Sequence, residues 1–265
     1  MKPDKISRTE KLPFRIGTTS YIYPDDILPN VDRLKDKVDD IELILFEEDS
    51  AGNIPTQQDL IELKKISNEW GITYTVHLPL EIDLGCEIEK KRRCSTESVI
   101  KLIRRLSVIN PYAYILHLNL SEEAKQNIRL WQNRVNKSLK EIIEGKFIVA
   151  KSIAVENLGY PFEHVHDLVI KNNFSVCVDI GHLVVQELDP LKHCEKYFKK
   201  TRVIHLHGVN GSKDHVSLKY FDGGLIRRIA QFLKGNKYQG ILTLEVFSQT
   251  DFEESMGVLW ENLYS

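Results

Sequence analysis

The chain has 265 residues, of which 42% are hydrophobic and 28% are charged, with a formal net charge of -2 and a pI near 6.5. This balance excludes a strong overall attraction to nucleic acid, and no stretch approaches the ~20 apolar residues of a membrane span. We therefore expect a single cytoplasmic domain over residues 1–265, in which residues 1–13 form a short N-terminal extension. The four cysteines lack C-x-x-C spacing, which favours reduced thiols.

Short apolar runs alternate with amphipathic segments along the chain, which predicts repeated β/α units and a parallel sheet. The runs begin at Phe14, Ile41, Ile72, Tyr112, Ser152, Phe174, Val203 and Ile241. Helices are predicted between runs over residues 56–70, 121–144, 161–172 and 222–234. Eight units in about 250 residues predict an α/β fold, the (β/α)8 TIM barrel. A doubly wound sheet is the alternative, but GTTSYIYP after the first run lacks its glycine-rich phosphate turn.

Ionisable residues stand at the ends of at least six of these runs. In chain order they are His77, His117, Glu156 with Asn157, Asp179 with His182, His205 with His207, and Glu245. In a TIM barrel the carboxyl ends of the strands form one mouth, so these side chains are expected to meet there. Burying carboxylates and imidazoles together is costly unless a cation compensates them. Donors of this kind, with no cysteine among them, predict Zn²⁺, Mn²⁺ or Fe²⁺.

The segments VEN, VDIGH, IHLHG and LEVF, in this order on the last four predicted strands, resemble the xylose isomerase-like TIM barrels that include the endonuclease IV family. The resemblance extends over nearly the whole chain. It implies that a divalent metal is held directly by Glu156, Asp179, His205 and Glu245.

Two branches of that superfamily fit. Sugar isomerases and epimerases commonly work at one metal, whereas endonuclease IV-like phosphodiesterases use several and recruit further histidines. His77, His117, His182 and His215 stand where such histidines would fall, which favours two or more metals and phosphodiester hydrolysis. The isomerase or epimerase class remains the alternative, because its members can use histidines at strand ends to hold sugar hydroxyls.

A narrower resemblance links FRIGTTSYIYPDDILPNV, IELILFEE and KDHVSL to the cobamide-remodelling phosphodiesterases called CbiR. It implies cleavage of the phosphodiester in the nucleotide loop of a corrinoid. The chain departs from endonuclease IV, which has an Asp-x-His metal pair after the seventh strand, because here Asp214 directly precedes His215. This puts a third metal in doubt. Few loops are basic, so a small or medium-sized anionic substrate is expected and duplex DNA is not.

The resemblance and the residue types together suggest roles for the side chains. Glu156 or Glu245 is expected to bridge two metals and to act as a base, with His77 and His117 on a second metal. His182 is a metal ligand and catalytic group in a phosphodiesterase, and a substrate contact in an isomerase. Candidate substrate contacts are Asn157, His207, Asp214, Thr18, and Arg92 and Arg93 from a long connection over residues 80–95, with Glu47 as a weaker candidate.

Two further hypotheses stay open at this point. A DNA-repair endonuclease would need many phosphate contacts, for which the mildly acidic chain is poorly suited. A barrel that binds a ligand without catalysis would not need the intact acid and imidazole set. The sequence pattern indicates no particular oligomeric state.

Overall fold

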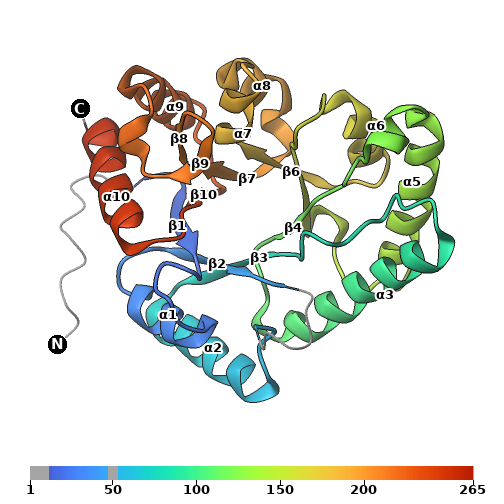
Figure 1. Ribbon diagram of the computed structural model, residues 1–265. Helices are drawn as coiled ribbons and strands as arrows, with labels where there is room; N and C mark the ends of the chain where they lie inside the picture. The colour runs from blue at the N-terminus through green and yellow to red at the C-terminus, as the bar shows by residue number, and fades with distance from the viewer. Residues whose placement is uncertain (1–11, 47–52, 265) are drawn as a thin grey trace.

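Eight parallel strands close into a barrel at the centre of the molecule (Figure 1). The computed structural model describes residues 12–46 and 53–264. The barrel strands, paired in the order β1-β10-β7-β6-β5-β4-β3-β2, are β1 (Arg15–Thr19), β2 (Asp40–Ile44), β3 (Thr73–His77), β4 (Tyr114–Leu116), β5 (Ile153–Glu156), β6 (Ser175–Asp179), β7 (Thr201–Leu206) and β10 (Ile241–Leu244). Each of the eight predicted strands is present, and the TIM barrel is confirmed.

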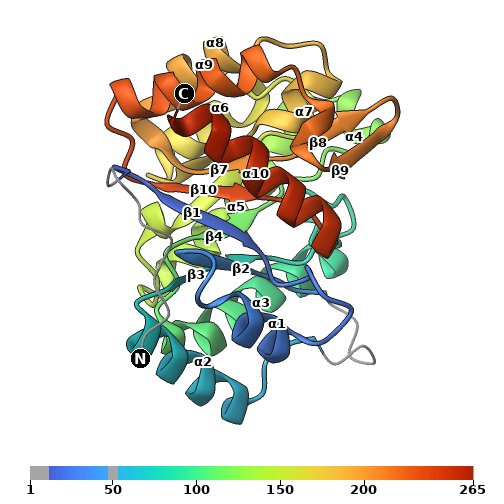
Figure 2. The same cartoon turned by 90° about the vertical axis from the view of Figure 1, so that its left-hand side faces the viewer.

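A ring of helices covers the outside of the barrel, and Figure 2 shows α10 running across the strands β1 and β10. The helices are α1 (Ile27–Leu34), α2 (Gln57–Trp70), α3 (Glu89–Leu106), α4 (Glu122–Lys125), α5 (Ile128–Glu144), α6 (Glu163–Lys171), α7 (Ile180–Val185), α8 (Pro190–Tyr197), α9 (Gly223–Gly235) and α10 (Gln249–Tyr264). Among the described residues no helix is long and apolar enough to cross a membrane.

Helix α2 illustrates how local sequence sets these elements. The Thr56 hydroxyl accepts the backbone N–H of Asp59, and the Asp59 carboxylate accepts that of Thr56, which is a capping box. The helix ends at Gly71, whose φ of 70° is in the left-handed region that glycine adopts without steric cost. Between these ends Leu60 and Leu63 recur at helical spacing and are buried against the barrel.

Three connections differ from the predicted pattern. The helix predicted over 121–144 is two helices, because the Asn127 side chain accepts the N–H of Leu130 and starts α5 anew. The predicted connection over 80–95 stops early, since α3 begins at Glu89. After β7 the chain forms an antiparallel hairpin of β8 (Gly208–Asn210) and β9 (Lys213–Val216), which the sequence pattern did not indicate.

The barrel interior has an apolar layer below a polar one. The apolar layer is a small cluster formed by Ala113, Ile115, Ala154, Cys177, Val203 and Ile241. Successive side chains of a strand alternate between faces, so a residue two positions further along points the same way. Glu156, Asp179 and His205 each follow a member of the cluster by two positions. The strands therefore point these polar side chains into the barrel, one layer above the apolar cluster.

Candidate metal centre

The ionisable side chains from six barrel strands converge at the carboxyl ends of those strands. Most are almost completely buried, and the side chains of His117, His182 and His215 keep 13%, 22% and 23% exposure. These three imidazoles are therefore the ones that a substrate at the mouth can reach. Among the described residues five overlapping groups of donors form here, each with its ligand atoms within 4.8 Å of one another. Three of them, described below, contain all the predicted ligands, and the other two add Cys177, beside Glu156 and His205, and Glu42, beside His77 and Glu245.

Glu156 presents its two carboxylate oxygens to different donors. Oε2 lies 2.9 Å from Nε2 of His117 and 3.4 Å from Nε2 of His77. Oε1 faces the other way, 3.5 Å from Nδ1 of His205 and 3.6 Å from Nδ1 of His182. The two oxygens of this carboxylate thus face two different sets of imidazoles.

The central group consists of Glu156, Asp179, His205 and Glu245. His205 Nδ1 lies 3.0 Å from Oε2 of Glu245 and 3.8 Å from Oδ2 of Asp179. All three of these atoms are buried, and none makes a hydrogen bond within the described residues. Buried polar atoms rarely lack a hydrogen bond, since each such atom costs about 1–3 kcal/mol, so this set of carboxylate and imidazole donors fits a divalent cation at this point.

The first outer group consists of His77, His117 and Glu156. The Nδ1 atom of His77 lies 2.9 Å from the carbonyl oxygen of Leu78, an arrangement that places the ring proton on Nδ1. Its Nε2 atom is then free to bind a cation, because a metal-bound imidazole normally donates from its other nitrogen. The pair of histidines and the shared carboxylate are a donor set for a second cation.

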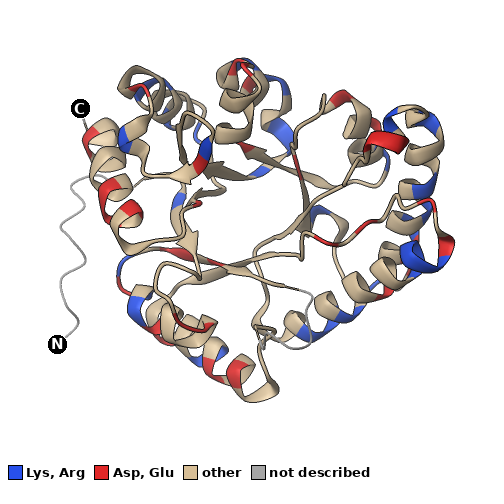
Figure 3. Cartoon of the chain, viewed as in Figure 1, with Lys and Arg blue, Asp and Glu red and all other residues tan. Residues whose placement is uncertain are grey.

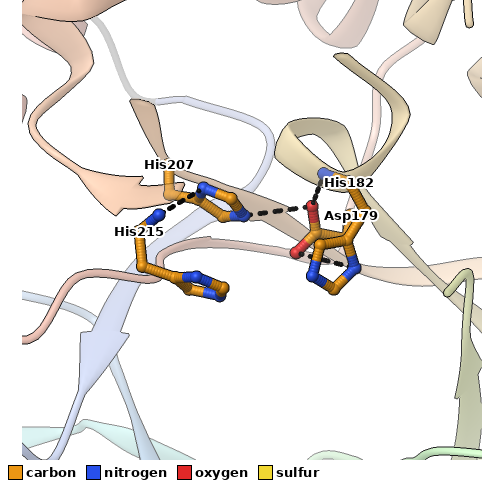
Figure 4. A group of neighbouring side chains, drawn as sticks. All are labelled: Asp179, His182, His207 and His215. Carbon is orange, nitrogen blue, oxygen red and sulfur yellow. Dashed lines mark hydrogen bonds and ion pairs between the residues drawn. The ribbon is translucent and has the colours of Figure 1, made fainter. Parts of the chain in front are cut away.

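The second outer group consists of Asp179, His182, His207 and His215 (Figure 4). Nδ1 of His182 lies 3.1 Å from the carbonyl oxygen of Asn157, which leaves its Nε2 available. His215 lies in β9 with φ at 53°, a left-handed conformation uncommon outside glycine, and its Nε2 is 3.4 Å from Oε2 of Glu245. Its Nδ1 lies 3.2 Å from Oδ1 of Asp214, so Asp214 contacts the imidazole directly.

Opposite charges hold one another in place across this centre. Burial disfavours the charged form of His77, but the carboxylate of Glu156 raises its pKa to about 9. Burial also disfavours the charged form of His215, but the carboxylate of Glu245 raises the pKa of His215 to about 9. Burial would raise the pKa of Glu156, but the imidazoles of His117 and His205 hold it well below its usual range. Without a cation, protonated imidazoles neutralise the carboxylates.

Glu42 is a functional candidate that the sequence pattern did not single out. It is fully buried on β2, and its Oε2 lies 3.0 Å from Nε2 of His205. This contact turns the Nδ1 atom of His205 toward the central group. The signal in the sequence was an acid inside the apolar run IELILFE. Glu47, the weaker candidate on the same run, lies outside the described residues.

Two predicted substrate contacts are engaged with the barrel itself. The Asn157 side chain donates to the carbonyl oxygen of Asp179 at 3.0 Å and accepts the Asp179 N–H at 2.8 Å, so it clamps the end of β6. The Thr18 hydroxyl is fully buried and donates to the carbonyl oxygen of Leu244 at 2.9 Å. Both side chains hold strand ends that carry metal-centre residues.

Arg92 and Arg93 were expected on a loop and instead lie in the first two turns of α3. Nη1 of Arg92 donates to the carbonyl oxygen of Cys86 at 2.7 Å, and Nη2 of Arg93 lies 3.6 Å from the exposed carboxylate of Glu97. Neither guanidinium contacts the donor groups in the described structure. His207, also predicted as a substrate contact, is fully buried beside Asp179.

The sequence profile of one protein family, described as xylose isomerase-like TIM barrel, matches residues 35–261. The chain belongs to the xylose isomerase-like TIM barrel family. Members of this family typically bind divalent metals, and the three donor groups are candidate sites for them. A search of curated proteins found no significant match.

Solved structures of this family's fold resemble the chain over almost its whole length. A D-tagatose 3-epimerase-like protein matches with a TM-score of 0.79 and 18% identity, over 94% of this chain and 97% of the other. Endonuclease IV from Thermus thermophilus matches with a TM-score of 0.71 and 15% identity, over 94% and 98%. D-psicose 3-epimerase from Clostridium cellulolyticum matches with a TM-score of 0.72 and 15% identity, over 94% and 96%. At these identities the likeness establishes the fold.

Proposed function

We propose that the chain is a metal-dependent phosphodiester hydrolase that uses more than one divalent cation. The observation that carries the proposal is the position of Glu156, whose two carboxylate oxygens face two different groups of histidine and carboxylate donors. A one-metal site requires only the central group. The additional pair of His77 and His117 supports a multinuclear centre, which suits a phosphate with several charged oxygens.

Bound divalent cations would supply the Lewis acidity that polarises the phosphate and lowers the pKa of a water molecule. The chain's own residues hold and orient the reactants. Glu156 and Glu245 both lie beside Nδ1 of His205 and are placed to take the proton of the attacking water. His182 and His215 keep part of their surface exposed and can hydrogen-bond the substrate at the mouth.

The proposed substrate is a small or medium-sized anionic phosphodiester, with the nucleotide loop of a corrinoid as the first compound to test. Figure 3 shows many of the Lys and Arg residues on the outer helices, such as α3 and α5. A duplex is normally gripped through many phosphates by basic side chains, so DNA is a poor candidate. The resemblance of the N-terminal segment and of KDHVSL to the CbiR family supports the corrinoid.

A sugar isomerase or epimerase is the second candidate, and the fold comparison favours it. Several of the similar solved structures are named as sugar epimerases, and one as endonuclease IV. The central group alone, with the two carboxylates of Glu156 and Glu245, would suit a proton transfer next to a carbonyl at one metal. The outer histidines would then contact sugar hydroxyls.

Metal analysis combined with a substrate panel tests both candidates. The purified chain is incubated with a corrinoid coenzyme, with an oligonucleotide containing an abasic site, and with ketoses in deuterated water. A phosphodiesterase retains at least two metals per chain and cleaves a phosphodiester. One metal together with deuterium incorporation into a ketose would establish the epimerase instead.

His117→Ala separates the candidates further, because among the described residues His117 contributes to the first outer group alone. In a phosphodiesterase this variant loses about one metal per chain and at least about 100-fold in hydrolysis. His166→Ala is the matched control, since His166 lies on the outer helix α6 beside Asp167. Full hydrolysis by His117→Ala would contradict the multinuclear proposal.

A further inference from the structure

A cavity of about 650 Å³ lies at the end of the barrel opposite to the candidate metal centre. It is lined by the segments that lead into five neighbouring strands, β10, β7, β6, β5 and β4. A strand advances about 3.3 Å per residue, so Arg202, in this cavity, lies about 10 Å along β7 from His205. A ligand in the cavity is therefore separated from the central group by the length of the strands.

The cavity gathers positive charge without a carboxylate to balance it. Five of its lining side chains are cationic and none is acidic, the five being Lys151, Lys199, Lys200, Arg202 and Lys237. The whole chain has 36 Lys and Arg against 38 Asp and Glu, so this excess is a local feature and not an effect of composition. Within the part of the chain that the structure describes, none of the five forms an ion pair with a carboxylate. Unbalanced charge of one sign on a concave surface attracts ions of the other sign.

Arg202 is held in a fixed position by Tyr112. Its Nε and Nη2 atoms donate to the carbonyl oxygen of Tyr112 at 2.8 and 2.7 Å, and its guanidinium carbon lies 4.0 Å from the centroid of the Tyr112 ring. A guanidinium has further N–H groups, which these contacts leave available. The planar fork of N–H groups matches the geometry of a phosphate. The side chain therefore offers donors to an anion with little further loss of freedom.

Lys200 is oriented by an uncharged partner as well. Its Nζ atom donates to Oδ1 of Asn173 at 3.0 Å, and Asn173 also lines the cavity. An ammonium group has three N–H donors, so this contact leaves others available. Because both Arg202 and Lys200 are held by neutral oxygens, their positive charges remain available to a ligand.

We propose that this cavity binds a small molecule that carries two or more phosphate groups. A phosphate monoester has a charge of about −1.5 to −2 near pH 7, so about two or three such groups balance the five cations. The volume of the cavity lies within the range of about 300–1,000 Å³ that is usual for small-molecule sites. Since the cavity and the candidate metal centre lie at opposite ends of the strands, the two ligands do not compete for the same side chains.

Chemical-shift mapping of the full nitrogen-15-labelled chain with inorganic pyrophosphate tests the proposal, and inorganic phosphate is the comparison ligand. We expect saturable shifts of the backbone amides of residues 198–202 and 237–240, with pyrophosphate bound more tightly than phosphate. Binding should weaken as NaCl is added, because salt screens the attraction. Shifts confined to the metal centre around His117 and His182, or no saturable shift up to about 10 mM pyrophosphate, would overturn the proposal.

Variants that each remove one positive charge test whether the cavity side chains bind the ligand. Arg202→Gln should weaken pyrophosphate binding by about 10–100-fold, because it removes oriented, charged N–H donors. Lys200→Gln should weaken it by about 2–5-fold. Lys192→Gln is the matched control, since Lys192 lies on α8 beside Asp189 and outside the cavity. Equal losses in Lys192→Gln and Lys200→Gln would show a general attraction to the chain instead of a site.

Arg202→Gln also removes the contact with Tyr112 and could prevent folding. The double variant Lys199→Gln/Lys200→Gln leaves Arg202 and Tyr112 in place and decides the question in that case. Unchanged affinity for pyrophosphate in the double variant would refute the proposal.

A single-stranded oligonucleotide distinguishes a small ligand from a polymer that carries the same phosphate chemistry. A small-molecule site predicts that the oligonucleotide binds no more tightly than pyrophosphate. Tighter binding of the oligonucleotide, with shifts that extend from the cavity to α3 and α5, would assign the surface to a polymer and refute the proposal.

Discussion

At the scale of single residues, the candidate metal centre depends on groups that contact a metal-binding side chain and hold it in position. Glu42 faces the outer nitrogen of His205, Asn157 clamps the backbone of Asp179, and the carbonyl oxygen of Leu78 fixes His77. Each removes rotational freedom from a donor before a cation arrives. Such outer contacts typically change metal affinity or activity by about 10–100-fold.

Replacing Glu42 by alanine is expected to weaken binding of the central cation by about 10–100-fold, because the ring of His205 loses its orienting carboxylate. Glu42→Gln should lose less, since its amide oxygen can still accept a hydrogen bond. Titration against a chelator of known affinity measures both. Glu62→Gln is the control, because Glu62 pairs with Lys65 on the outer helix α2, away from the centre. Equal affinities in Glu42→Ala and wild type would contradict the role.

The ring of His207 lies so close to Gly181 that a residue with a side chain does not fit at this position. Gly181→Ala should destabilise the fold by about 1–3 kcal/mol, since the new methyl group overlaps the ring of His207. Gly257→Ala in α10 meets no atom within 4 Å and should instead stabilise the fold by about 0.5–1 kcal/mol. Urea denaturation measures both changes. Shifts of the same sign would show that crowding by His207 is not the cause.

At the scale of elements, local signals predicted the repeating part of the fold and missed contacts between distant segments. Glu156 and Asp179 could be placed because each ends an apolar run, and a barrel has one mouth. Whether Glu42 faces inward depends on the pairing of β2 with β1 and β3, which a lone strand sequence does not reveal. The environment of His207 depends on a hairpin and a glycine from separate segments, so the sequence alone indicated only a polar contact.

The burial of Asp40, at the start of β2, predicts that the free energy of unfolding depends on pH. It is fully buried, its Oδ2 accepts from the Thr73 hydroxyl at 2.6 Å, and burial raises its pKa to about 7. Between about pH 4 and pH 7 the unfolded chain is ionised at Asp40 and the folded chain is not. The free energy of unfolding therefore falls as pH rises, by about 1.4 kcal/mol per pH unit and about 4 kcal/mol in all.

Asp40→Asn removes the titrating carboxyl group, so the free energy of unfolding of this variant should depend less on pH over the same range. Urea unfolding of both proteins at several pH values between 4 and 8 gives the comparison, in which the other ionisable groups cancel. The variant should gain stability relative to wild type as the pH increases. A constant difference between the two proteins would show that Asp40 ionises at its ordinary pKa in the folded barrel.

At the scale of the whole molecule, the residues of the centre come from strands around the barrel. Glu42 comes from β2 and Glu245 from the end of β10, and both contact the same imidazole of His205 on β7. A cation held by these strands binds only the closed barrel, so binding stabilises the folded chain against the unfolded one.

Metal loading is therefore expected to raise the thermal midpoint. A free Zn²⁺ concentration of 100 times the dissociation constant adds about 2.7 kcal/mol, which for a chain of this size is a shift of roughly 5–11 °C. Differential scanning calorimetry with Zn²⁺ and with EDTA measures the shift. Asp179→Asn should reduce it, because it weakens the central group. An identical midpoint in both solutions would exclude a cation that bridges the strands.

The shared carboxylate of Glu156 also sets an order for assembly during synthesis. Every donor of the first outer group precedes β6, whereas Glu245 follows Glu156 by 89 residues. At about 5–20 residues per second, a ribosome needs about 4–18 s to add that length. The nascent chain thus contains all three side chains of the first outer group several seconds before Glu245, the last residue of the central group, is added. A cation bound by the first outer group at that stage would be bound before the barrel is complete.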